Sequence, residues 1–126
     1  QKLGSKQYKE LSIAYNAMSK NSYFIGGKNR FDTDFTSIMG GRGVCKAGGE
    51  AVRGLVIHTK KYGTMGIAIK IIDGNQRAIE VATMAVLNHL NILHIKEKEK
   101  LSHYESKQLV NCNKLNIGKV VSRIIK

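Results

Sequence analysis

Apolar residues recur at helical spacing in two parts of the chain, residues 6–20 and residues 76–90. In the first part the apolar positions follow the i, i+3, i+4, i+7 pattern of an amphipathic helix. They are Leu11, Ala14, Tyr15 and Met18. In the second part small and branched side chains form the stripe, and Ile79 and Met84 flank it. That stripe is Ala78, Val81, Ala82, Ala85, Val86 and Leu90. Both patterns predict helices whose apolar stripes pack in a core, and Asn91 is expected to end the second helix.

Residues 29–39 predict a shorter helix between two glycine pairs. Its inner face would carry Phe35, Ile38 and Met39. Asp32 or Thr33 is a suitable N-cap, because short polar side chains accept hydrogen bonds from the first free backbone N–H groups. The glycines at 40 and 41 are typical of a helix end.

The middle of the chain predicts strands, at residues 44–46, 51–58 and 65–72. The third is almost continuously apolar, which indicates a strand buried on both faces. Residues 60–63 would form a hairpin turn, and Asp73-Gly74-Asn75 a tight turn. The tail, residues 108–125, predicts two more strands. Segregated helices and mostly antiparallel strands favour one α+β domain over residues 1–126.

The charge of +12 and the pI near 9.9 raise the question of an acidic partner. The lysines are scattered, and no arginine cluster or interleaved aromatic residues favour nucleic acid. We therefore expect neither a nucleic-acid nor a membrane partner, although a noncatalytic basic binding module remains the alternative. Cys45 and Cys112 are predicted to be reduced thiols of a cytoplasmic protein. No cysteine or histidine spacing indicates a metal site, and no cofactor is expected.

Lys46 is the strongest candidate for chemistry. It is the last residue of a short predicted strand and precedes Gly48 and Gly49, where a substrate could approach the backbone and N–H groups could hold an oxyanion. A lysine in a dry site can lose its proton and act as a base. Asp32, Asp73 and Asn75 are weaker candidates, since capping and turn formation explain these residue types equally well.

Four blocks of sequence together resemble the bacterial L-asparaginase II family, from about Tyr8 to the C-terminus. They are GGKNRFDTDF, CKAGGEA, GIAIKIIDGNQRA and a tail containing GKVV. The family is similar in fold to serine β-lactamases and glutaminases, in which a Lys-x-Gly element borders the active site. Lys46-Ala47-Gly48 looks like that element. Position 47 is Ala where the family commonly has Gly, so a degenerate member remains open.

The resemblance implies hydrolysis of L-asparagine to L-aspartate and ammonia through an acyl-enzyme. It implies Lys46 as a proton carrier, with Gly48, Gly49, Asp32, Asp73 and Asn75 binding substrate. The nucleophile would be the Ser of an S-x-x-K motif, which the 126 residues do not contain. The start of the chain has neither Met nor a signal-peptide pattern. We therefore expect a C-terminal segment, without its N-terminal half and inactive alone. Apolar surface exposed in such a segment would favour poor solubility or a homo-oligomer.

Overall fold

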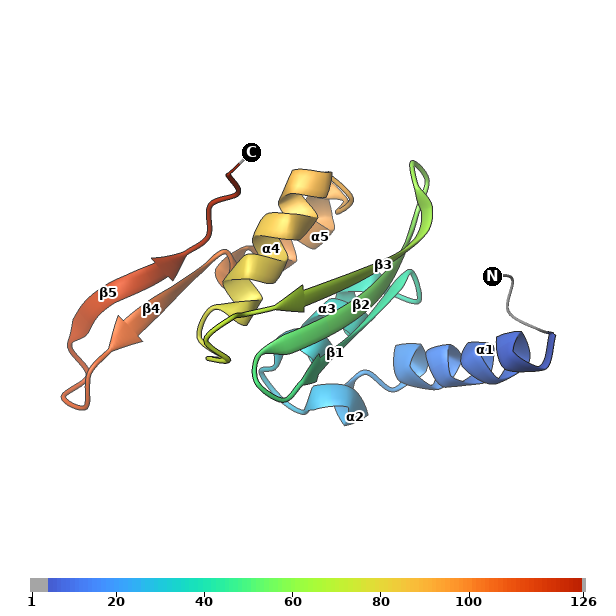
Figure 1. Cartoon of the computed structure of the whole chain (residues 1–126), viewed down its shortest axis with the longest axis horizontal. Coiled ribbons are helices and arrows are strands. Elements are labelled where there is room, and N and C mark those ends of the chain that lie inside the picture. Colours follow the sequence, from blue (N-terminus) through green and yellow to red (C-terminus); the bar gives the residue numbers. More distant parts are fainter. Residues whose placement is uncertain (1–4, 126) are drawn as a thin grey trace. The chain divides into compact units, whose positions relative to one another are not determined.

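The computed structural model describes residues 5–125 (Figure 1). The first four residues, part of the start that suggested a longer chain, lie outside this range. In chain order the elements are α1 (Ser5–Lys20), α2 (Tyr23–Gly26), α3 (Phe31–Met39), β1 (Gly43–Gly48), β2 (Val52–Thr59), β3 (Gly63–Lys70), α4 (Ile79–Leu90), α5 (Ile95–Leu101), the 3₁₀ helix η1 (Ser102–Tyr104), β4 (Ser106–Val110) and β5 (Asn116–Val121). Helices and antiparallel strands confirm the predicted α+β class.

The described residues form two compact units. Unit 1 runs to Lys46 and includes Leu55–Met65, whereas unit 2 is made of Ala47–Gly54 and the residues from Gly66 on. Each strand of the β1-β2-β3 sheet contributes residues to both units. The helices α1, α2 and α3 belong to unit 1, and every element after β3 belongs to unit 2.

Short connections join the strands of the sheet, as antiparallel hairpins require. The predicted turn at residues 60–63 is present, and Gly63 adopts a positive φ of 69° there. The prediction that the third strand is buried on both faces is wrong. Along β3 fully exposed residues alternate with half-buried ones, such as Met65, Ile67 and Ile69. Only one face of β3 is therefore covered. The prediction failed because β3 is an edge strand of the sheet, and apolar content alone does not tell an edge strand from a central one.

Helix α3 supplies much of the buried side-chain volume of unit 1. Phe31 and Phe35 are almost fully buried, and their rings stack with centroids 5.8 Å apart. Burying each stabilises the fold by roughly 1.5–3 kcal/mol. The predicted cap is wrong, because α3 begins at Phe31 with Arg30 as N-cap and no side-chain capping bond. Gly40 ends the helix in the left-handed conformation, as expected.

Helix α1 forms where the periodicity predicts it, but its apolar stripe is not in a core. Leu11 is 55% exposed, and Tyr15 and Met18 are only half-buried. The neighbouring Tyr8 and Ile13 are also exposed. The helix is held instead by polar and aromatic contacts: Tyr15 Oη donates to the Gly41 carbonyl at 2.8 Å, and its ring meets that of His58 edge to face.

In unit 2, helix α4 starts at Ile79, later than predicted, and ends at Asn91 as predicted. The predicted stripe is largely wrong, since Val81 alone of its members is fully buried. The buried residues of α4 are Ile79, Val81, Thr83, Met84 and Leu87. A polar contact lies on the buried face: Arg53, 3% exposed on β2, donates from its guanidinium to Thr83 Oγ1 at 3.5 Å. The buried threonine occupies part of the face assigned to apolar residues.

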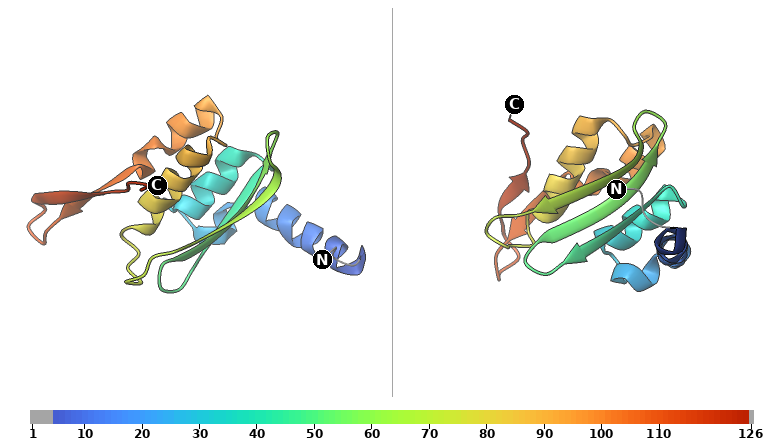
Figure 2. Two further views of the ribbon diagram at one scale, coloured as in Figure 1. Left: turned by 45° about the horizontal axis from the view of Figure 1, so that its top comes forward. Right: turned by 45° about the vertical axis from the view of Figure 1, so that its right-hand side comes forward.

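The tail forms the predicted two strands. β4 and β5 pair antiparallel from Ser106 opposite Val121 to Val110 opposite Asn116, with an irregularity after Leu109. Strand β5 contacts helix α4 (Figure 2). The lysine-rich segment at residues 96–100 is largely exposed and forms most of α5. Within residues 5–125 no helix has both the length and the apolar content that a membrane crossing would need.

Candidate functional site

Lys46 lies where strand β1 passes from buried to exposed surroundings. The three residues before it, Gly43, Val44 and Cys45, are buried, whereas the Lys46 side chain is exposed. Successive side chains of a strand point to opposite faces. Because Cys45 is directed toward helix α3, Lys46 is directed away from it. The strand therefore fixes the backbone of Lys46 while leaving its ammonium group accessible.

A cavity of about 550 Å³ lies beside Lys46 within unit 1. Apart from Lys46, its lining comes from α1, α2 and the short link between them. These residues are Ala17, Met18, Asn21, Phe24 and Ile25. The wall is mostly apolar, and the Asn21 amide donates through Nδ2 to the Ala17 carbonyl at 2.8 Å. A lysine at the edge of such a cavity can meet a bound molecule in a partly dehydrated environment.

Asp32 lies under the strand that carries Lys46. It is 4% exposed, and its Oδ1 accepts a hydrogen bond from the Cys45 thiol at 3.3 Å. The backbone N–H of Cys45 donates to Thr36 Oγ1, also on α3, at 3.2 Å. Two contacts from α3 therefore hold the residue next to Lys46. Because Asp32 is buried and contacts Cys45, it is suited to positioning strand β1.

The other four predicted residues lie in unit 2, on two turns that meet. Gly48 ends β1 and Gly49 begins the β1–β2 turn, whereas Asp73 and Asn75 belong to the turn after β3. Gln76 Nε2 donates to the Gly48 carbonyl at 3.4 Å. A Cβ on Gly74 would lie 3.6 Å from Glu50 Cβ. The structure thus brings together two sequence blocks more than twenty residues apart.

The glycine turn leaves its backbone open. A Cβ built on Gly49 would meet nothing within 4 Å, and one on Gly48 would meet Val52 at 3.6 Å. Glu50 and Ala51, which follow, both have positive φ. The Lys70 ammonium contacts the Glu50 carbonyl and lies 3.8 Å from its carboxylate. This contact holds the turn against the end of β3.

Asp73 and Asn75 organise their own turn. Asp73 Oδ1 accepts from the Asn75 N–H at 2.9 Å, and Asn75 Oδ1 accepts from the Arg77 N–H at 3.0 Å. The Arg77 guanidinium lies 3.4 Å from Asp73 Oδ2. Both side chains of this pair are about half exposed, so the ion pair contributes about 0–1 kcal/mol. Local turn formation explains both residue types, and the contact with the glycine turn is additional.

Sequence reasoning missed several residues of this region. Cys45, Glu50 and Gln76 carry the contacts that hold the Lys46 strand and the two turns, and Asn21 lines the cavity. Their spacing offers no signal, because each acts through a partner far away in the sequence or through the shape of a cavity. Asp73 and Asn75 were identifiable because their hydrogen bonds are local.

Metal-binding side chains do not gather in the described part of the chain. No group of three or more His, Cys, Asp or Glu residues there has the proximity that a metal ion needs. Neither cysteine forms a disulfide; Cys45 is buried and Cys112 is exposed. The interaction that Cys45 makes with Asp32 is accordingly that of a thiol with a carboxylate.

Comparison with known proteins agrees with the four sequence blocks. The family model described as L-asparaginase II matches residues 1–122, which covers nearly the whole chain. No curated protein matches the chain closely enough to count as a relative. A match of this extent does not depend on any single motif. It includes strand β1 with Lys46, the β1–β2 turn and the turn after β3. The chain therefore belongs to the L-asparaginase II family.

Proposed function

We propose that the protein is an L-asparaginase, which hydrolyses L-asparagine to L-aspartate and ammonia, and that Lys46 carries protons in the reaction. The observation that carries this proposal is the position of Lys46. It stands exposed at the end of a buried strand segment, beside a 550 Å³ cavity and two residues before an open glycine turn. Because the chain belongs to the L-asparaginase II family, amide hydrolysis is the reaction that we assign to these residues.

In the proposed reaction a serine hydroxyl adds to the side-chain amide carbon of asparagine. The C–N bond then breaks, ammonia leaves with the proton that it gains, and an ester to the serine remains. Water adds to that ester and releases aspartate, restoring the serine hydroxyl. The serine would lie outside residues 1–126, because no S-x-x-K motif occurs within them. Lys46 would take the hydroxyl proton or offset the charge of the tetrahedral intermediate.

The remaining candidates would shape the site. Backbone N–H groups of Gly48 and Gly49 suit the stabilisation of a developing oxyanion, because no side chain obstructs an approaching substrate at Gly49. Asp73 and Asn75 would keep the neighbouring turn in place against it. Asp32 would act through Cys45 on the strand that presents Lys46.

The test is ammonia release from L-asparagine by the full-length gene product and its Lys46→Ala variant. Lys28→Ala is the control, because it removes the same charge at an exposed residue that lies outside every helix and strand. We expect Lys46→Ala to lower kcat by at least about 100-fold, the usual contribution of a proton-transfer group. Lys28→Ala should retain activity. A Lys46→Ala enzyme with normal kcat would refute the role of Lys46.

The same assay separates the degenerate alternative. A folded full-length protein that releases no ammonia from L-asparagine would show that the family fold is kept without the activity. Parallel assays with L-glutamine would define the substrate preference, since the two amides differ by one methylene and a pocket distinguishes them by only about 1–3 kcal/mol.

A further inference from the structure

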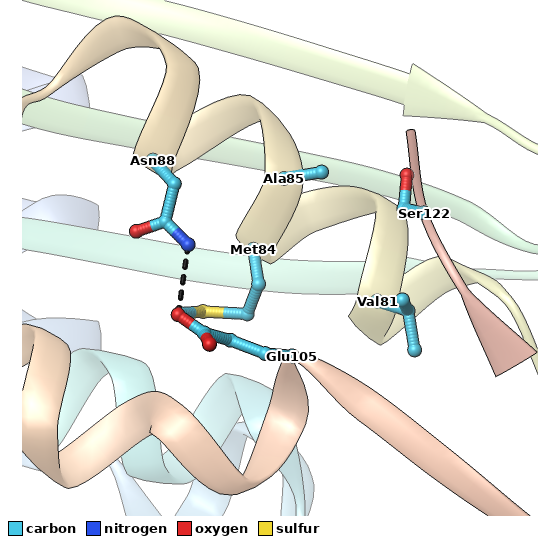
Figure 3. A pocket seen from close by; sticks show the side chains of 6 residues that line it. All are labelled: Val81, Met84, Ala85, Asn88, Glu105 and Ser122. Carbon is cyan, nitrogen blue, oxygen red and sulfur yellow. Dashed lines mark hydrogen bonds between the residues drawn. The ribbon is translucent and has the colours of Figure 1, made fainter. Parts of the chain in front are cut away.

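The hollow along helix α4 in unit 2 offers little to a ligand (Figure 3). Val81 and Met84 in its wall are buried, so they present almost no surface. Glu105, the one charged residue among the described residues that line it, already accepts a hydrogen bond from Asn88 at 2.9 Å. Ser122 lies at the other end of the hollow from Glu105. The polar groups of this hollow therefore do not converge on one ligand.

The cavity beside Lys46 in unit 1 has an accessible apolar surface. Phe24 is 86% exposed, and Met18 and Ile25 are half-buried. The volume of about 550 Å³ falls within the range of about 300–1,000 Å³ that is typical of sites for small organic ligands. Ammonia needs little more room than one water molecule, about 30 Å³. The cavity is therefore much larger than the leaving group of L-asparagine requires.

Polar side chains contribute little to the wall of this cavity. Among the described residues that line it, only Lys46 and Asn21 have polar side chains, and only Lys46 is charged. The Asn21 amide already donates to the Ala17 carbonyl at 2.8 Å, which ties it to the end of its own helix. Such a lining is typical of a site that holds an apolar group and orients it through very few polar contacts.

The proton transfer proposed for Lys46 determines which part of a substrate would lie in the cavity. When the C–N bond breaks, the leaving nitrogen takes up the proton that the serine hydroxyl gave up. A side chain that delivers this proton comes within about 2.6–3.2 Å of the nitrogen. Any substituent on that nitrogen is therefore brought next to the Lys46 side chain, where the apolar cavity lies.

We propose that the protein hydrolyses β-aspartyl amides whose leaving nitrogen carries a short apolar substituent, and that this substituent packs on Phe24, Met18 and Ile25. The inference rests on the proposed function, because it uses the same serine and the same proton carrier. The serine oxygen bonds to the amide carbon, the C–N bond breaks, and the nitrogen leaves as a primary amine with the proton from Lys46. Water then releases L-aspartate from the ester. L-Asparagine is the member of this substrate class whose nitrogen has no substituent.

The experiment compares two amides that differ in one group. The full-length gene product is assayed for amine release from the β-propylamide and the β-hydroxyethylamide of L-aspartate, beside ammonia release from L-asparagine. The two substituents have nearly the same size, but a hydroxyl replaces the terminal methyl group. We expect kcat/KM to be at least about fivefold higher for the propylamide, because a hydroxyl group placed on an apolar wall loses hydrogen bonds to water.

Two variants test whether the cavity causes this preference. Phe24→Ala removes the most exposed part of the apolar wall. It should lower the ratio of kcat/KM for the propylamide to kcat/KM for L-asparagine at least about fivefold. Tyr8→Ala is the control, because it removes an exposed aromatic side chain of α1 that does not line the cavity, and it should leave the ratio within about twofold. The ratio cancels any loss of folded enzyme, since both substrates are measured with the same sample.

The outcomes separate this inference from the proposed function. If L-asparagine is hydrolysed but the propylamide is not, or is no better than the hydroxyethylamide, the inference is overturned and the proposed function stands. Equal changes of the ratio in Phe24→Ala and Tyr8→Ala also overturn it, because the preference would not come from this cavity. Propylamine release without ammonia release from L-asparagine supports the inference and refutes the L-asparaginase activity. Release from none of the substrates overturns both.

Discussion

The thiol of Cys45 donates a hydrogen bond to Oδ1 of Asp32 at 3.3 Å, and both side chains are buried. Cys45 directly precedes Lys46, so this bond ties helix α3 to the strand that presents the candidate catalytic ammonium. A thiol is a weak donor, and the Cys45 N–H adds a second bond to α3, to Thr36 Oγ1 at 3.2 Å. The stability of unit 1 and the placement of Lys46 therefore share these two contacts.

Replacing Asp32 with Ala should lower the free energy of unfolding by about 1–3 kcal/mol, because the buried carboxylate contacts are lost. Asp32→Asn should lose less, since an amide oxygen can still accept from the thiol. Denaturant unfolding measures both. Glu10→Ala, an exposed acidic position on α1, is the control and should stay within about 0.5 kcal/mol of wild type. If Asp32→Ala unfolds at the same denaturant concentration as the wild type, the contact between Asp32 and Cys45 does not stabilise the fold.

We expect the contribution of Tyr15 to the free energy of unfolding to depend on pH. Burial raises the pKa of its hydroxyl above the ordinary value near 10, and the positive charge of Arg42 opposes this only in part. The folded state therefore favours the neutral hydroxyl that donates to the Gly41 carbonyl. Its contribution is fully present below the unfolded pKa near 10 and is lost as pH rises through the higher folded pKa.

Tyr15→Phe should accordingly lower the unfolding free energy by about 0.5–1.5 kcal/mol at neutral pH. The difference between wild type and variant should shrink above about pH 10. Paired denaturant titrations from pH 8 to 11 measure that difference. Tyr8→Phe is the control, because Tyr8 is 69% exposed and should show no such trend. A difference that stays constant or grows with pH would refute the assignment.

Gly49 should matter for activity and not for folding. A Cβ there meets nothing within 4 Å, and the residue has no positive φ. Gly49→Ala should therefore unfold like wild type but hydrolyse asparagine at least about tenfold more slowly, because the methyl group narrows the approach to the backbone. Gly54→Ala, equally unobstructed, should retain activity. Full activity in Gly49→Ala would remove the glycine turn from the site.

Gly43, the first residue of β1, provides the opposite case. A Cβ there would lie 3.1 Å from the Val56 carbonyl oxygen and from Met39 Cγ. A backbone oxygen cannot move as a flexible side chain can, so Gly43→Ala should destabilise by about 1–3 kcal/mol. Thermal unfolding beside Gly49→Ala distinguishes the two glycines. Equal melting temperatures would show that the strand and α3 adjust more readily than their spacing indicates.

Asp73 can be tested for a role beyond its turn. Asp73→Asn keeps an oxygen for the Asn75 N–H and loses only an exposed ion pair with Arg77. We expect its kcat/KM for asparagine to stay within about threefold of wild type, whereas Asp73→Ala loses the turn bond and falls further. A comparable loss of kcat/KM in both variants would show that the carboxylate charge itself contacts the substrate.

Local signals predicted the elements well and their burial poorly. Glycine and asparagine at positions 40 and 91 marked two helix ends, because the left-handed backbone there is one that few residue types adopt. The exposed stripe of α1 and the displaced face of α4 were not predictable. Periodicity reports which side chains share a face, and it does not report what, if anything, covers that face.

The sequence by itself determined the α+β class, the family and the order of the main elements, although it did not indicate α2, α5 or η1. These depend on side-chain periodicity, turn residues and motifs, which are all local along the chain. Only the tertiary structure decided that Asp32 accepts from Cys45, that Gln76 donates to Gly48, and that Asn88 donates to Glu105. Such contacts join residues from 13 to 28 positions apart, and chain folding alone sets which of many compatible partners meet.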